Sequence, residues 1–572
     1  MKFPPALRLG VLLFWGCVSA HAASVAPVAA VHGMVVSAQH LATRVGVEVL
    51  QDGGNAIDAA VAVGYALAVV YPAAGNLGGG GFMTIQLVDG RKTFLDFREK
   101  APLAATKKMY LGADGEVVKG LNTHGHLAVA VPGTVAGLEL ALARYGTLKR
   151  ERLIAPAIQL AERGFALDQG DVDLLLTATQ ALRQDPASAA IFLSQDRPYA
   201  SGNRLVQQDL ARTLRAISDD GVTGFYQGWV GAAIVAASQS GRGLITQADL
   251  DQYRARELRP VECDYRGLQV VSAPPPSSGG VVLCEMLNVL EGYPLSEWGF
   301  RSARAVHAQI ETMRHAYADR NNYLGDPDFV DNPLARLLDR AYAGRVRAAI
   351  NPAKAGVSKD LMPGVAPHEG SNTTHYSIVD QFGNAVAVTY TLNEWFGAKV
   401  TATGTGVLLN NEMDDFTAKP GVPNSFGLVQ GEANAIAPGK RPLSSMSPTI
   451  LSKDGKPLLI LGTPGGSRII TAVLHTILNV VDYGMDIQEA VDAPRFHQQW
   501  LPPITNLERF ALSPDTQQQL MGMGHEFGDP PPPSHLAAIL IGAPTLAGKP
   551  VGANRYYGAN DPRRRTGLTL GY

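Results

Sequence analysis

The chain has 572 residues, and its 49 Lys and Arg residues nearly balance its 51 Asp and Glu residues, giving a formal net charge of −2. This balance lacks the excess positive charge that drives nonspecific binding to nucleic acid, so we expect no nucleic-acid partner. Hydrophobic residues make up 46% of the chain and charged residues 17%. That composition is typical of a packed globular protein and excludes a disordered one.

The first 22 residues have the pattern of a secretory signal peptide. Lys2 and Arg8 lead into an apolar run over 9–18, and Ala20-His21-Ala22 has the small residues of a cleavage site. About ten apolar residues are too few to cross a membrane as a helix. We therefore expect cleavage before Ala23 and export, to the periplasm if the source is a Gram-negative bacterium and otherwise by secretion. No membrane span is expected after signal removal.

Three cysteines are present, Cys17 in the signal segment and Cys263 and Cys284 later in the chain. A lipoprotein signal ending at Cys17 is the weaker alternative, because Phe14 and Trp15 stand where smaller residues are expected. An oxidising compartment would allow Cys263 and Cys284 to form a disulfide, but their spacing matches no local motif. We expect both to be unpaired core residues.

The segment after the signal changes from a helical to a strand-like pattern. The spacing over 37–72 predicts two Ala-rich helices separated by Asp52-Gly53-Gly54, the second of them buried. The glycines at 78–81 follow a helix and precede a strand, which is the reverse of the dinucleotide-binding order, so we expect close packing there. Two alternating runs around Asp89-Gly90 then predict a β-hairpin.

Apolar spacing predicts further helices around 134–145, 151–164, 205–217 and 301–319. The segment 351–372 contains prolines and glycines without an apolar period, which indicates a long exposed linker. The 13 histidines are scattered and form no H-E-x-x-H motif. We therefore expect neither a metal site nor a cofactor.

The residues after the linker alternate with period two and predict a strand pair with its turn in 380–384. Pairing Val379 with Ala385 makes one face polar or small and the other apolar, whereas a one-residue slip would mix the two faces. The same register sets Thr373 opposite Thr391. Two threonine hydroxyls should therefore lie side by side.

A threonine where a loop enters a strand is suited to be an N-terminal nucleophile. The Thr373 hydroxyl would attack the carbonyl of Asn372, the chain would break there, and the freed α-amine would activate the same hydroxyl. An α-amine has a pKa of roughly 7.7 to 8.0, so a useful fraction is neutral near neutral pH. The alternative is a plain edge hairpin with a surface threonine pair, and the pattern alone leaves both open.

Five short motifs stand in order along this part of the chain: Asn372-Thr373-Thr374-His375-Tyr376-Ser377, Thr391-Leu392-Asn393, Asn410-Asn411-Glu412-Met413-Asp414-Asp415-Phe416, Lys440-Arg441-Pro442-Leu443-Ser444-Ser445-Met446-Ser447-Pro448 and Gly462-Thr463-Pro464-Gly465-Gly466-Ser467. Together they resemble the γ-glutamyltranspeptidase family, also called glutathione hydrolases, and the likeness extends from about Gly33 to Tyr572. The resemblance implies an α/β (α+β) fold, a four-layer αββα Ntn-hydrolase sandwich made as a proenzyme. Self-cleavage would give a large subunit, 23–372, and a small catalytic subunit, 373–572, within one integrated fold.

The resemblance also implies roles for single residues. Thr373 is expected to be the nucleophile, Thr391 to orient it, and Gly465 and Gly466 to form the oxyanion hole with their N–H groups. The expected ligands of the substrate are Arg98, Ser444 and Ser445 for its α-carboxylate and Asn393, Glu412 and Asp415 for its α-amino group. The run 420–430 resembles a lid in which Phe426 replaces a frequent tyrosine, so an apolar cover is expected.

The implied reaction is ping-pong acyl transfer. The nucleophile takes the γ-glutamyl group of glutathione or another γ-glutamyl amide and passes it to water or to an amino-acid or dipeptide acceptor. A glutaryl acylase of the same superfamily is an alternative, but a glutaryl group lacks the α-amine that Asn393, Glu412 and Asp415 would bind. A non-catalytic binding protein on the same scaffold is the other alternative, and failure to self-cleave would support it.

Overall fold

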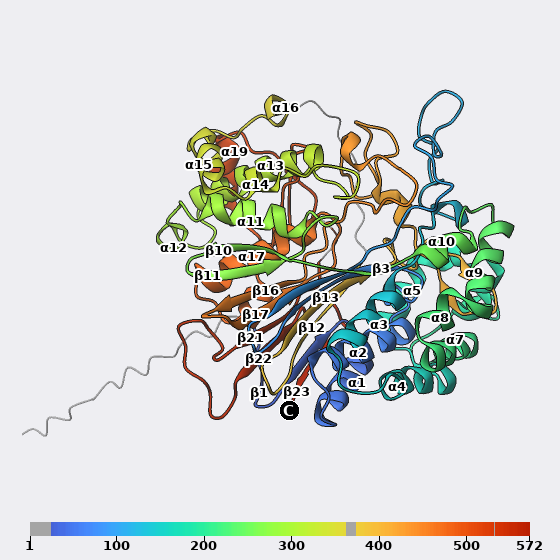
Figure 1. Cartoon of the computed structure of the whole chain (residues 1–572). Helices are drawn as coiled ribbons and strands as arrows, with labels where there is room; N and C mark the ends of the chain where they lie inside the picture. Colours follow the sequence, from blue (N-terminus) through green and yellow to red (C-terminus); the bar gives the residue numbers. More distant parts are fainter. Residues whose placement is uncertain (1–23, 362–372, 531, 533) are drawn as a thin grey trace, which may run out of the picture.

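The computed structural model describes residues 24–361, 373–530, 532 and 534–572. The expected signal peptide, Cys17 and Asn372 lie outside the described residues. Two seven-stranded sheets stack face to face, and helices cover the outer face of each sheet (Figure 1). The four-layer αββα sandwich implied by the resemblance is thus confirmed.

The first sheet has the strand order β23-β2-β12-β13-β3-β4-β9, and all its neighbouring strands are antiparallel. In this order the strands are Leu568–Gly571, Met34–Ser37, Thr374–Val379, Ala385–Thr391, Gly80–Gln86, Lys92–Phe97 and Arg256–Leu258. Strands from before and after the expected cleavage point therefore interleave in one sheet.

The second sheet has the strand order β1-β22-β21-β17-β16-β11-β10, again antiparallel throughout. Its strands are Val28–Ala30, Tyr556–Asn560, Ala537–Ile541, Lys456–Gly462, Thr449–Lys453, Leu268–Ser272 and Val261–Tyr265. Small and aliphatic side chains from both sheets, such as Val36, Ala387 and Ile460, fill the space between them. This inner layer fixes how the two sheets face each other.

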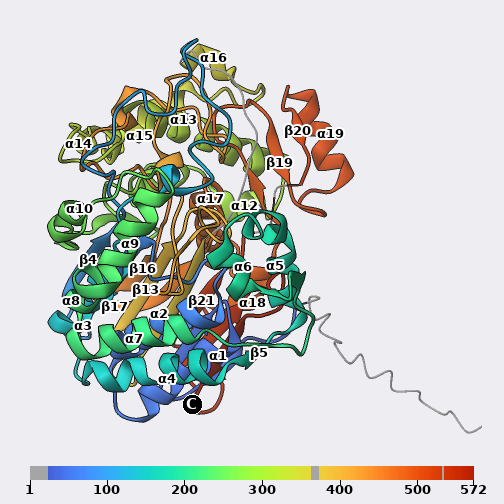
Figure 2. The ribbon, with the colours of Figure 1, turned by 90° about the vertical axis from the view of Figure 1, so that its right-hand side faces the viewer.

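The outer face of the first sheet is covered by helices of the first 250 residues, chiefly α1, α2, α3, α4 and α7 (Figure 2). They span His40–Gln51, Ala56–Val70, Thr134–Tyr145, Arg150–Arg163 and Gln208–Asp220. The other sheet is covered by α11, α13, α17 and α18, which span Gly279–Leu290, Ala303–Tyr323, Arg468–Val481 and Ile487–Asp492. The predicted helices are all present, and every residue of α2 is buried, as its continuous apolar sequence predicted.

The hairpin of β12 and β13 has the predicted register, since Val379 pairs with Ala385 and His375 with Thr389. The alternative of an edge hairpin is wrong, because β2 and β3 flank the pair on its two sides. Both of its faces are buried. The apolar face packs on α2, where the Tyr376 hydroxyl donates to the carbonyl of Ala60 at 3.0 Å.

The polar face of the hairpin lies between the two sheets. There His375 shares a hydrogen bond with Thr389 at 2.8 Å, and the Ser377 hydroxyl donates to the Ala537 carbonyl at 3.0 Å. Burial lowers the pKa of His375 to about 3, so its ring is neutral. The hairpin is therefore held from both faces, and the end that carries Thr373 and Thr391 is a rigid part of the molecule.

The predicted close packing of the glycines at 78–81 is confirmed, because a Cβ at Gly79 would lie 2.0 Å from the Thr391 carbonyl oxygen. The prediction of unpaired cysteines is wrong. Cys263 on β10 and Cys284 on α11 form a disulfide with a Cα–Cα distance of 5.9 Å. The sequence did not reveal the pairing, because the packing of α11 on β10 brings the two residues together and no local spacing motif marks them.

The expected linker 351–372 has structure in its described part. The short helix α16, Ser358–Leu361, lies there, and Ser358 is buried. Its hydroxyl accepts a hydrogen bond from Arg314 at 2.5 Å, and Ala355 N donates to the carbonyl of Met523 at 2.8 Å. These polar contacts order a segment that has no apolar period. Among the described helices, none has the length and apolar character needed to cross a membrane.

Candidate active site

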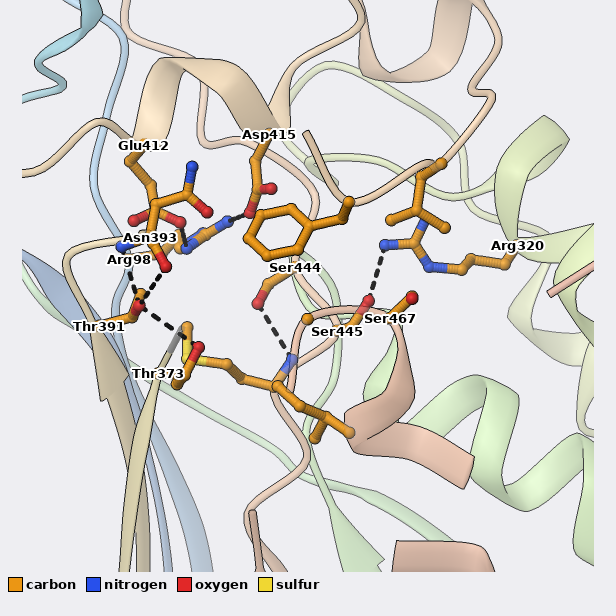
Figure 3. A pocket seen from close by; sticks show the side chains of 15 residues that line it. Arg98, Arg320, Thr373, Thr391, Asn393, Glu412, Asp415, Ser444, Ser445 and Ser467 are labelled. Atoms are coloured by element: carbon orange, nitrogen blue, oxygen red, sulfur yellow. Dashed lines mark hydrogen bonds and ion pairs between the residues drawn. The ribbon is translucent and has the colours of Figure 1, made fainter. Parts of the chain in front are cut away.

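A pocket lies where the ends of β4, β12 and β13 meet loops from the second half of the chain (Figure 3). Its lining brings together ten of the residues singled out in the sequence: Arg98, Thr373, Thr391, Asn393, Glu412, Asp415, Phe426, Ser444, Ser445 and Gly466. Gly465 directly precedes the lining residue Gly466, and Asn372 lies outside the described residues. The remaining lining residues are Arg320, Leu428, Met446, Ser467 and Ile469.

The threonine pair stands at the end of the central hairpin. The Thr391 hydroxyl donates to the Thr373 hydroxyl oxygen at 3.4 Å, and it accepts a hydrogen bond from Asn393 N at 2.8 Å. Thr373 is only 5% exposed. The β-branched side chains restrict rotation of both hydroxyls. The arrangement leaves a fixed hydroxyl oxygen facing the pocket.

Three charged side chains form the second part of the pocket. Arg98 follows β4 directly and makes ion pairs with both Glu412 and Asp415, which lie on a 3₁₀ turn at Glu412–Asp415 (Figure 3). The Arg98 backbone is held as well, since the Tyr253 hydroxyl donates to its carbonyl at 2.8 Å. A further carboxylate, Glu99, lies 3.6 Å from the guanidinium.

Burial governs the titration of this cluster. It raises the pKa of Glu412 well above its usual range, and the Arg98 guanidinium opposes that shift. Burial also raises the pKa of Glu99 to about 7, again against the effect of Arg98. Oε2 of Glu412 has no hydrogen-bond partner among the described residues. The cluster thus holds acceptor capacity that a positively charged group could use.

Two serines close a third side of the pocket. Ser444 is tied to the segment before α11, because Ser278 donates to its carbonyl through its N–H at 2.8 Å and its hydroxyl at 2.7 Å. The Ser444 hydroxyl accepts from Met446 N at 3.1 Å. Ser445 accepts a hydrogen bond from the Arg320 guanidinium at 2.9 Å (Figure 3). The Ser444 carbonyl and the Ser445 hydroxyl are therefore held by contacts that cross the expected subunit boundary.

The turn at Gly465 and Gly466 leads into α17, so it lies at the N-terminal end of a 14-residue helix. The first N–H groups of a helix have no partner within it, and the helix dipole favours negative charge there. Gly466 has a φ of +58°, and a Cβ on it would lie 2.4 Å from the Phe426 ring. A glycine is required here by both conformation and space.

The loop at 420–430 contributes Phe426 and Leu428 to the pocket lining, and Phe426 is 4% exposed. The Asn424 side chain shapes the loop by accepting from Phe426 N at 3.0 Å and Leu428 N at 3.1 Å. Ser425 is anchored to Asp414 by its N–H at 3.1 Å and by its hydroxyl. Burial raises the pKa of Asp414 to about 7. Phe426 gives the pocket lining an apolar side chain, and a covering role for this loop stays a prediction.

The sequence interpretation missed two residues of helix α13. Arg320 lines the pocket, and the Tyr317 hydroxyl donates to the Ser467 carbonyl at the turn that leads into α17. The helix was predicted to end at 319 but continues to Tyr323, because its last turn is buried rather than exposed. The available signal was a pair of polar residues, Tyr317 and Arg320, three positions apart near the end of a predicted helix. That signal was too weak to assign a site.

Three side chains of metal-ligating type come together away from the pocket, contrary to the impression of scattered histidines. They are His307, Glu311 and His525. His307 already shares a hydrogen bond with His525 at 2.7 Å and with the Asn351 carbonyl at 2.8 Å. Arg314 donates to Glu311 at 3.3 Å. Within the described residues this cluster is internally hydrogen-bonded, and it links α13 to the C-terminal part of the chain.

The αββα sandwich, with a threonine hydroxyl at the start of a central strand facing a lined pocket, defines an N-terminal nucleophile hydrolase. A family profile described as Gamma-glutamyltranspeptidase matches residues 42–570. The chain therefore belongs to the γ-glutamyltranspeptidase family, a family of enzymes of γ-glutamyl transfer and hydrolysis.

Individual relatives agree with this placement. The chain is 70% identical to a glutathione hydrolase proenzyme of Pseudomonas sp. (strain A14), with 96% of each chain covered. It is 48% identical to the glutathione hydrolase proenzyme of Escherichia coli (strain K12), covering 99% of this chain and 98% of that one. A cephalosporin acylase from Bacillus halodurans has a similar structure, with a TM-score of 0.83, 26% identity, and 98% and 99% of the two chains covered.

Proposed function

We propose that this protein is an exported glutathione hydrolase and γ-glutamyltransferase whose nucleophile is Thr373. In the precursor, the Thr373 hydroxyl attacks the Asn372 carbonyl, the peptide nitrogen leaves, and water hydrolyses the resulting ester. The products are chains 23–372 and 373–572, which stay together as a heterodimer. The interleaving of strands from both parts in one sheet supports this, because neither part completes the sheet alone.

The freed α-amine of Thr373 then acts as the base in turnover. It takes the proton of the Thr373 hydroxyl as the oxygen attacks the γ-carbonyl of the donor, and that proton passes to the leaving amine. The hydrogen bond from Thr391 at 3.4 Å supports an orienting role for that residue. Water or an acceptor amine attacks the γ-glutamyl ester in the second half of the reaction and restores the enzyme.

The donor is held at its α-carbon by both of its charged groups. Arg98, Ser444 and Ser445 bind the α-carboxylate, and Asn393, Glu412 and Asp415 bind the α-ammonium. Without a ligand, Arg98 is paired with Glu412 and Asp415. When the donor binds, its carboxylate lies next to Arg98 and its ammonium next to the two carboxylates, so opposite charges remain adjacent. The Asn393 amide nitrogen donates to the Asn411 carbonyl at 2.9 Å, which turns its own oxygen toward an ammonium.

Negative charge that develops on the γ-carbonyl oxygen is stabilised by the N–H groups of Gly465 and Gly466. Their place at the N-terminal end of α17 supports this assignment, since donors there are aligned before the reaction begins. Phe426 covers the site and excludes water from the donor side. Glutathione and other γ-glutamyl compounds are the donors, and amino acids or dipeptides are the acceptors.

The single observation that carries the proposal is the joint lining of one pocket by the buried Thr373–Thr391 pair and the Arg98–Glu412–Asp415 cluster. The nucleophile and a site for two opposite charges are thereby set at fixed positions. This combination suits a γ-linked glutamyl donor, whose carbonyl is separated from its charged α-carbon.

The test compares three anilides as donors: γ-glutamyl, glutaryl and α-glutamyl. We expect release of aniline from the γ-glutamyl donor, and a loss of at least about 10²-fold in kcat/KM for the other two, because each leaves buried charges unpaired. Preference for the glutaryl donor would contradict the proposal in favour of an acylase, the activity named for the similar B. halodurans protein. A chain that neither self-cleaves nor turns over any donor would contradict it in favour of a binding protein.

A further inference from the structure

Arg320 brings an arginine from the part of the chain before the expected cleavage point into the pocket. It lies near the end of α13 and is 1% exposed. Its guanidinium donates three hydrogen bonds, to the Ser278 hydroxyl at 2.9 Å, the Asn321 side-chain oxygen at 2.8 Å and the Ser445 hydroxyl at 2.9 Å. All three acceptors are neutral. Among the described residues, Arg320 makes no ion pair with a carboxylate.

A buried guanidinium without a carboxylate partner is costly and calls for a reason. Burial lowers the pKa of Arg320 to about 10, which still leaves it charged at neutral pH. The other pocket arginine, Arg98, is balanced by Glu412 and Asp415. The positive charge of Arg320 is therefore the uncompensated one, and it would favour an anion bound nearby.

The contact with Ser445 also fixes the direction of a hydroxyl proton. A guanidinium can only donate hydrogen bonds, so Ser445 Oγ accepts from Arg320 and its own proton must point elsewhere. Ser445 lines the pocket, and its hydroxyl donates to no acceptor among the described residues. Its proton is thus left for a ligand, with the charge of Arg320 directly behind it (Figure 3).

The neighbouring serine is held by the same arginine through one intermediate. Nε of Arg320 donates to the Ser278 hydroxyl, and that hydroxyl in turn donates to the Ser444 carbonyl at 2.7 Å. Both members of the serine pair therefore depend on Arg320, one directly and one through Ser278. This chain of hydrogen bonds ends at the Ser444 carbonyl, so it fixes the backbone position of Ser444 and with it the place of the Ser444 hydroxyl.

We propose that Arg320 is a specificity-determining positioning residue, which makes the pocket select donors with a free α-carboxylate by polarising Ser445 and holding Ser444. This inference rests on the proposed function, in which the serine pair binds that carboxylate. It adds that residues 23–372 supply two cations to the α-carboxylate end of the site, Arg98 by contact and Arg320 through the serines. A donor whose α-carboxylate is replaced by a neutral carboxamide should gain nothing from Arg320.

The experiment measures kcat and KM of the full, self-processed protein with a γ-glutamyl anilide and with its α-carboxamide analogue. For R320Q we expect KM for the carboxylate donor to rise about 10- to 100-fold, the range for a hydrogen bond that involves a charged group. The kcat/KM for the carboxamide should stay within about twofold of the wild type. The ratio between the two donors should therefore fall by at least about tenfold.

The matched control is R301Q. Burial lowers the pKa of Arg301 to about 10 as well, but its guanidinium donates to the Pro494 carbonyl and packs on Phe300 and Phe496, and the residue does not line the pocket. Loss of this charge should leave the donor ratio unchanged. R320K keeps the charge without the fork of donors, and its donor ratio should lie between those of the wild type and R320Q.

An equal loss for both donors in R320Q, or no loss for either, would overturn the inference, because a merely structural role does not distinguish a carboxylate from a carboxamide. If R320Q fails to process into two chains, R320K provides the same test. A wild-type donor ratio in R320K would overturn the inference. A wild-type protein without turnover would instead contradict the proposed function, so the two failures are distinguishable.

Discussion

The threonine pair and the charged cluster occupy the same pocket but are built in different ways. Thr373 and Thr391 are neutral groups on adjacent central strands, and their contact follows from the register of β12 and β13. Arg98, Glu412 and Asp415 are charged groups that follow a strand or lie on a 3₁₀ turn, and ion pairs between distant segments hold them. The sheet thus places the proposed nucleophile, and the loops place the charged groups that we propose bind the donor.

The two regions should therefore control different steps. Self-cleavage needs only the threonine hydroxyl, its orientation and the adjacent peptide bond, so the sheet region should suffice for it. Turnover of a donor needs the charged cluster as well. Changes in the two regions should therefore separate processing from turnover.

The largest expected effect comes from T373A. Removal of the hydroxyl should abolish both cleavage and turnover, with a loss of at least about 10⁴-fold in kcat, because the same oxygen is the nucleophile in both reactions. Denaturing gel electrophoresis and the anilide assay measure the two. T374A is the matched control, since the buried Thr374 hydroxyl has no hydrogen-bond partner among the described residues. Two subunits from T373A would refute the assignment.

The next largest effect is expected for R98Q. The change leaves the buried Glu412 and the partly buried Asp415 without their cation and removes the fork for the α-carboxylate, so kcat/KM should fall about 10²- to 10³-fold. Cleavage into two chains should persist at close to the wild-type extent. If R98Q blocks processing as completely as T373A does, the separation between the two regions is wrong.

A smaller effect is expected for T391A. Loss of one hydroxyl that donates to the nucleophile at 3.4 Å should slow both processing and turnover about tenfold, with KM for the donor nearly unchanged. T391S restores the hydroxyl without the methyl group and should recover most of the rate. Time courses of cleavage and steady-state kinetics test this, and a change in KM alone would place Thr391 in donor binding instead.

The smallest effect on activity is expected for D561N, which alters a charged cluster outside the pocket. Asp561 is buried between Arg495 and Arg563, and despite its burial these cations lower its pKa to about 2. At pH 7 the substitution should lower the free energy of unfolding by about 2 kcal/mol, which is the shift of nearly two pKa units expressed as stability.

The pH dependence of that loss has a definite sign. The folded pKa of Asp561 is depressed, so its contribution is complete above the unfolded value of about 3.9 and disappears as the pH falls through about 2. Urea unfolding at several pH values should show the wild type and D561N converging in acid. A gap that widens in acid would contradict the account, as would a large loss of kcat.

The sequence predicted the sheet region of the site far better than the loop region. The period-two pattern of β12 and β13 alone gave the correct register, because a slip would have mixed polar and apolar faces. It did not show that both faces are buried, since His375 and Ser377 are polar. In the structure these two side chains share a hydrogen bond, and the Ser377 hydroxyl also bonds to the Ala537 carbonyl of the second sheet. Tertiary packing supplied that information.

The charged cluster could be predicted only from the resemblance to the γ-glutamyltranspeptidase family. Arg98 and Glu412 are more than 300 positions apart in the chain, and no local pattern links them. Arg320 was missed by both routes: its helix was predicted to end at 319, one residue before it, whereas the helix continues to Tyr323. The Cys263–Cys284 disulfide was misjudged for a different reason, since the packing that brings the two cysteines together leaves no periodic signal in the sequence.

The most direct test of Thr373 as the N-terminal nucleophile is the intact mass and N-terminal sequence of the purified protein. We expect two chains, 23–372 and 373–572, with the smaller one beginning Thr-Thr-His-Tyr and therefore carrying the free α-amine of Thr373. A single uncut chain, or a cut at any other residue, would leave Thr373 without that amine and would contradict the proposed nucleophile.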